Sequence, residues 1–144
     1  MGGYFTEITD LYDDLRKNDA TLCLYPIGFV DAATIEMDKR YAVFVDPDYF
    51  SSIKEMKEAI AHEAGHCATG CTHKVSSSLD LIEKHEYKAD RWAIEKYLPF
   101  DEINKAVKAG YTETWELADY FDVSEQAIKK ALSYYIERRG KHFG

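Results

Sequence analysis

The run His62-Glu63-Ala64-Gly65-His66 constrains this chain more than any other part of its sequence. It lies in a stretch that favours a helix, with Ser51 or Ser52 as N-cap and Gly70 after its last residue, Thr69. Residues four apart lie about 40° apart around a helix, so both imidazoles reach one metal ion while Glu63 sits beside its open coordination position. The spacing therefore predicts a zinc site held by His62 and His66.

The helical wheel places the apolar side chains of this helix on a different face from the two histidines. We expect that face to pack in the core while the histidines point into a separate space. Cys67 and Cys71 adjoin His66 and invite a Cys/His zinc site, but they lie on the apolar face, where free cysteine packs as a small hydrophobe. The expected apolar face comprises Ile53, Met56, Ile60, Ala64, Cys67 and Cys71.

A catalytic zinc usually takes a third protein ligand, which must come from another part of the chain. His73 falls one place late for the metzincin pattern, and His85 points away from the apolar side of its own helix. In a helix expected over residues 79–98, Glu86 and Asp90 share a face with apolar side chains. Zinc would compensate the buried carboxylate of Glu86, and Asp90 would accept a hydrogen bond from a ligand histidine. The alternative for both is a salt bridge to Lys or Arg, or exposure at the edge of the apolar face.

Composition narrows the class of protein. A net charge of −8 disfavours non-specific electrostatic binding to nucleic acid or to an anionic membrane. No apolar run is long enough to span a bilayer. Three cysteines, an odd number, without an export signal indicate reduced thiols. We therefore expect a cytoplasmic protein.

The order of patterns predicts an α+β fold of one helix, a small antiparallel sheet and further helices. A helix is expected over 4–17, a strand over 22–27, and a hairpin from 34–37 and 40–45, the last offering an edge to an extended substrate. Asp101 would cap a short helix to Ala109, and helical patterns follow over 114–121 and 124–139. We expect a core of residues 1–110 and a helical appendage of 111–144 within the same compact unit.

The strings KEAIAHEAGHCATG and HEYKADRWAIEKYLP, with the preceding hairpin, resemble the ImmA/IrrE family of bacterial and prophage metallopeptidases over roughly residues 30–100. The resemblance implies a minimal zincin-like fold, zinc as cofactor and Glu86 as third ligand. It also implies hydrolysis with Glu63 as the base, and a neighbouring helix-turn-helix repressor of a mobile element or stress response as the protein substrate. The group that stabilises the oxyanion stays open among Tyr87, Tyr97, His73 and His85.

The C-terminal pattern over 115–128 is typical of a helix-turn-helix, with Asp122 where the turn usually has glycine. Residues 114–139 lack a clear basic face, so we expect them to pack or to dock a protein partner rather than to bind DNA. This segment also supports the rival function, a non-catalytic zinc-binding transcription regulator or protein-interaction module. A closed four-ligand metal site would favour that rival, and an open site with Glu63 beside a water would favour hydrolysis.

Overall fold

The computed structural model describes residues 8–70 and 78–144. The first part of the fold runs α1 (Ile8–Lys17), β1 (Ala20–Leu24), β2 (Ala32–Met37), β3 (Arg40–Val45), a 3-10 turn (Pro47–Tyr49) and α2 (Ile53–Thr69). It continues through α3 (Leu79–Tyr97), α4 (Phe100–Lys108), α5 (Thr114–Phe121) and α6 (Glu125–Ser133), which ends in a π-helical turn (Tyr134–Arg138). The fold is α+β and consistent with a minimal zincin-like arrangement, as the sequence predicts.

Two compact units make up the described chain, one extending to Ala93 and one beginning at Ile94, so the division falls inside α3. Helix α4 packs against α5 in the second unit. The expected division into residues 1–110 and 111–144 of one compact unit stays a prediction.

The three strands form a mixed sheet in the order β1-β3-β2. The predicted hairpin is confirmed: β2 and β3 are antiparallel and joined by Asp38 and Lys39, whose φ values of 50° and 64° fit a type I′ turn. Strand β1 joins β3 in parallel, so the expected antiparallel order holds for one of the two pairings. The prediction that the strand over 40–45 is an edge is wrong, because β3 is hydrogen-bonded on both sides. Among the described strands, β1 and β2 are the edges.

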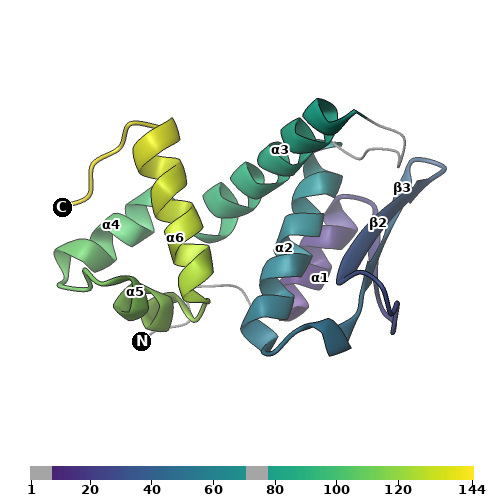
Figure 1. The fold of residues 1–144 in the computed structure, drawn as a ribbon, viewed down its shortest axis with the longest axis horizontal. Helices are drawn as coiled ribbons and strands as arrows, with labels where there is room; N and C mark the ends of the chain where they lie inside the picture. Colours follow the sequence, from purple (N-terminus) through teal and green to yellow (C-terminus); the bar gives the residue numbers. More distant parts are fainter. Residues whose placement is uncertain (1–7, 71–77) are drawn as a thin grey trace. The chain divides into compact units, whose positions relative to one another are not determined.

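One face of the sheet carries the core of the first unit. Leu22 and Val43 are paired and buried on this face, because alternate side chains of a strand point the same way. Helices α1 and α2 pack here, α1 against β1 and α2 against β2 and β3. Figure 1 shows α2 between α3 and the sheet. The largest fully buried side chains of this unit are Leu11, Leu15, Val43, Val45, Asp46 and Ile60.

Both predicted ends of α2 are confirmed. The side chain of Ser52 accepts a hydrogen bond from the Glu55 N–H at 3.2 Å, and Gly70 ends the helix in the left-handed region, with φ 66°. Met56, Ile60, Ala64 and Cys67 are buried as expected, but Ile53 is 65% exposed. Ile53 begins the helix beside exposed Ser51 and Ser52, so the periodic pattern extends one turn beyond the packed face.

The second unit is helical and has its own core. Tyr135 donates a hydrogen bond to the Leu98 carbonyl oxygen at 2.8 Å, and this ties the end of the chain to the end of α3. Pro99, not Asp101, is the N-cap of α4; its carbonyl accepts from the N–H groups of Glu102 and Ile103, and Asp101 lies in the first turn. The buried apolar side chains of this unit include Ile103, Leu117, Phe121, Val123, Ile128 and Ala131.

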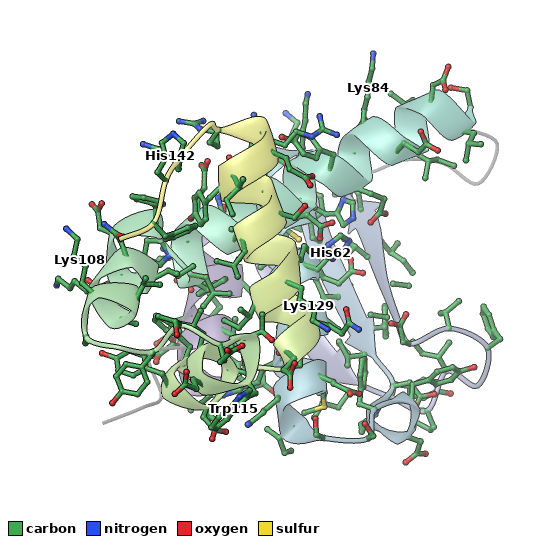
Figure 2. All side chains as sticks on the ribbon, turned by 60° about the vertical axis from the view of Figure 1, so that its left-hand side comes forward. His62, Lys84, Lys108, Trp115, Lys129 and His142 are labelled. Atoms are coloured by element: carbon green, nitrogen blue, oxygen red, sulfur yellow. The ribbon has the colours of Figure 1, made fainter. Side chains whose placement is uncertain are left out.

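Helices α5 and α6 form the predicted helix-turn-helix-like pair. Asp122 adopts the left-handed conformation at the turn, with φ 57°, which aspartate tolerates better than most residues. Ser124 caps α6 by accepting from the Ala127 N–H at 3.1 Å. Trp115 and Lys129 project outward from α5 and α6 (Figure 2). No helix in the described part of the chain is long and apolar enough to cross a membrane.

Candidate metal centre

Three side chains that the sequence singles out meet between α2 and α3. His62 and His66 point from α2 toward Glu86 on α3, and one potential ligand atom from each lies within 4.8 Å of the others. The Nε2 atoms of the two histidines are 3.2 Å apart. The Glu86 carboxylate places one oxygen 2.5 Å from His62 Nε2 and the other 3.2 Å from His66 Nε2. The labelled His62 is visible in Figure 2.

The arrangement of these donor atoms fits a divalent metal ion. Two tetrahedral ligands at the usual zinc–nitrogen distance of about 2.0–2.1 Å lie about 3.3 Å from each other. The separations between the histidine Nε2 atoms and between His66 and Glu86 are both 3.2 Å, close to this value, whereas His62 Nε2 and the nearer Glu86 oxygen are at hydrogen-bond distance, 2.5 Å. The two imidazole rings are nearly perpendicular, at 88°, and their potential ligand atoms lie within 4.8 Å of each other and of the Glu86 carboxylate. Their role as ligands stays a prediction.

Asp90 lies one turn after Glu86 and contacts the other ring nitrogen of His62. Its Oδ1 is 2.7 Å from His62 Nδ1, which favours the tautomer with the proton on Nδ1 and the lone pair on Nε2. Burial lowers the pKa of His62, but the hydrogen bonds and charges of Asp90 and Glu86 outweigh it and raise the pKa to about 10. Without a metal, the two carboxylates therefore hold a proton on His62.

Gly65 allows the helices that carry these residues to cross closely. A Cβ atom at Gly65 would lie 2.4 Å from the backbone oxygen of Ala89, a residue between Glu86 and Asp90. Ala89 is fully buried at this crossing. Only a residue without a side chain fits, so Gly65 helps to set the distance between the histidine pair and the carboxylate pair.

Glu63 points to the sheet side of α2, where sequence reasoning placed no partner. Its Oε2 accepts a hydrogen bond from the Thr34 hydroxyl of β2 at 2.5 Å. Thr34 is opposite Val43 in the sheet and therefore on the inward face. The signal that could have found Thr34 is a polar residue at an inward position of a strand, because a hydroxyl that faces the core needs a hydrogen-bond partner.

The other residues that the sequence singles out are the cysteines near His66 and the four residues considered for oxyanion stabilisation. Cys67 is buried, as expected for a core residue, and burial together with the charge of Glu63 raises the pKa of its thiol to about 12. His85 and Tyr87 are half-buried on α3, and Tyr97 is buried near its end. Their part in oxyanion stabilisation stays a prediction. Cys71 and His73 lie outside the described residues.

Comparison with protein-family models places most of the chain in a known family. The family model of peptidase M78, described as the IrrE N-terminal-like domain, matches residues 31–133. This stretch contains β2, β3 and the two helices of the candidate metal centre, and it ends with the last residue of α6. No curated protein and no solved structure gives a significant match.

Proposed function

The chain belongs to the M78 family of metallopeptidases, and on that premise we propose that it is a zinc-dependent endopeptidase whose metal is held by His62, His66 and Glu86. The convergence of two imidazoles and one carboxylate within 4.8 Å carries this proposal. Imidazole and carboxylate are ligands that zinc accepts, and three protein ligands leave one tetrahedral position for water or substrate.

The chemistry is hydrolysis of a peptide bond. Bound by His62, His66 and Glu86, zinc would supply a Lewis acid that makes water a stronger nucleophile near neutral pH. Glu63 accepts the proton of the attacking water and returns it to the amine nitrogen as the C–N bond breaks, so that one water yields a carboxylic acid and an amine. Asp90 holds His62 in the tautomer that leaves Nε2 available.

The substrate in this proposal is a protein segment, and we assign the role to a neighbouring helix-turn-helix repressor in the cytoplasm. The resemblance to the ImmA/IrrE kind supports that choice of substrate. An extended segment can add to the outer edge of β2, since in the described sheet β2 is hydrogen-bonded to β3 alone. The hydrogen bond from Thr34 on β2 to Glu63 supports this edge as the substrate side of the centre.

The proposal is tested with a proteome-derived peptide library incubated with the zinc-loaded chain and read by mass spectrometry. We expect new termini from the wild type and none from Glu63→Gln, which keeps the shape of the side chain and should still bind one zinc ion. A candidate repressor, tested in parallel, should be cleaved at one or a few sites. A wild type that produces no new termini, or a Glu63→Gln chain that cuts equally well, would contradict the proposal.

A further inference from the structure

Thr34 links the sheet to the helix of the metal centre. Its hydroxyl donates to Glu63 across 29 residues of sequence, at 2.5 Å. The acceptor is a carboxylate, and hydrogen bonds to charged groups are roughly twice as strong as those between neutral groups. The contact therefore restrains the side chain that the proposed reaction uses to move a proton.

The position of Thr34 in β2 makes this restraint stiff. Thr34 shares the inward row of the sheet with Val43 and Leu22, both buried. A β-branched side chain has few χ1 rotamers, and neighbours on a pleated face restrict it further. The hydroxyl is thus aimed at Glu63 by the strand itself, with little conformational freedom left to lose.

The backbone of Thr34 faces the outer edge of the sheet. In an antiparallel pair, hydrogen-bonded and non-hydrogen-bonded positions alternate, and the pair that closes a two-residue turn is hydrogen-bonded. Here that pair is Met37 and Arg40, so Ile35 and Ala33 also bond to β3. The N–H and C=O of Thr34 then point away from β3, toward a strand that would add to this edge.

We propose that Thr34 is a positioning residue. Its hydroxyl holds one oxygen of Glu63 and leaves the other for the attacking water, while its backbone N–H and C=O set the register of the substrate strand. This inference rests on the proposed function, in which Glu63 is the catalytic base. Losing the hydroxyl would leave Glu63 free to rotate, and a misplaced base slows the chemical step more than it weakens substrate binding.

Three variants test this role with a peptide taken from the library as substrate. Thr34→Val keeps the shape and removes the hydroxyl, so we expect kcat to fall about 10- to 100-fold with KM nearly unchanged and one zinc ion still bound. Thr34→Ser restores the hydroxyl and should recover most of kcat. Thr21→Val makes the same change at an exposed position of β1, the other edge strand, and should leave kcat within about twofold.

A double-mutant cycle in the metal-free chain provides a readout that does not depend on activity. Thr34→Val should lower the melting temperature of the wild type by about 5 °C, because a hydrogen bond to a carboxylate is lost. In a Glu63→Ala background the same substitution should lower it much less. Equal shifts in both backgrounds would show that the two side chains are not coupled, and would overturn the inference.

The outcomes separate this inference from the proposed function. An active wild type, an inactive Glu63→Gln and an unchanged kcat in Thr34→Val would overturn the role of Thr34 and leave the peptidase intact. A Thr34→Ser chain as slow as Thr34→Val would also overturn it, because the hydroxyl would then not be the group that matters. A wild type without cleavage would instead contradict the proposed function, while the cycle would still report on the bond between Thr34 and Glu63.

Discussion

At His62, burial and charge have opposite effects on the pKa. Burial disfavours its protonated form, whereas the carboxylates of Asp90 and Glu86, both within 2.7 Å of its ring nitrogens, favour it. The carboxylates prevail, and the pKa rises to about 10. In the metal-free chain a proton balances charge that a metal ion would balance in the loaded chain.

The metal-free chain should therefore lose stability as the pH rises above the ordinary pKa of histidine. Protonated His62 stabilises the fold fully below about pH 6.5, and this contribution is lost as the pH rises toward 10. Urea unfolding in the presence of a chelator should show the free energy of unfolding falling from pH 6.5 to 8.5, by at most about 1.4 kcal/mol per pH unit. Asp90→Asn removes one charge and should flatten the slope. A wild type whose stability does not change over this range would contradict the assigned pKa.

Sequence reasoning located His62, His66, Glu86 and Asp90 because helical periodicity places residues on faces. Histidines four residues apart and carboxylates on an apolar stripe are local patterns, and they do not depend on what the helix packs against. The sequence did not identify Thr34 as a partner of Glu63, because that contact depends on which strand lies beside α2. A hydrogen bond between residues 34 and 63 is a property of tertiary packing, which no local pattern contains.

Among the elements, the crossing of α2 and α3 brings together the residues of the proposed metal centre. Each helix contributes part of the site, His62 and His66 from one and Glu86 and Asp90 from the other. The missing side chain of Gly65 permits the two helices to approach this closely at the Ala89 backbone. A shift of either helix would separate the histidines from the carboxylates.

Gly65→Ala should disturb both the fold and the site. The new Cβ would meet the Ala89 carbonyl oxygen at 2.4 Å, so the helices must separate, at a cost of about 1–3 kcal/mol in the free energy of unfolding. Urea unfolding and zinc competition with a chromophoric chelator should show lower stability and weaker zinc binding. Adding Ala89→Gly should not restore either, because the obstacle is backbone. Zinc affinity equal to that of the wild type would show that the crossing does not set the site.

The elements themselves were largely predictable, because their ends carry local chemistry. Ser52 caps the start of α2 and Gly70 caps its end, and Asp38 and Lys39 form the hairpin turn, as the sequence indicates. The order of the strands was not predictable. An alternating pattern identifies a strand but not its neighbours, so the central place of β3 follows only from the pairing with β1 and β2.

Over the whole molecule, the distribution of charged residues bears on whether the C-terminal helices bind DNA or a protein. Residues 1–60 contain 12 acidic and 6 basic side chains, whereas residues 111–144 contain 6 and 5. Helix α6 begins with Glu125, which accepts a hydrogen bond from Thr114, and exposed Lys129 and Lys130 follow. This nearly neutral tail gives DNA phosphates little to bind. That residues 114–139 pack or dock a protein partner, rather than bind DNA, stays a prediction.

Zinc K-edge X-ray absorption of the stoichiometrically loaded chain is the measurement that decides whether His62, His66 and Glu86 form an open zinc site, as we propose. We expect a first shell of nitrogen and oxygen only, at about 2.0–2.1 Å, with outer-shell scattering from two imidazoles, and we expect Glu86→Ala to lose the metal. A sulfur ligand at about 2.3 Å, or stoichiometric zinc retained by Glu86→Ala, would contradict the account.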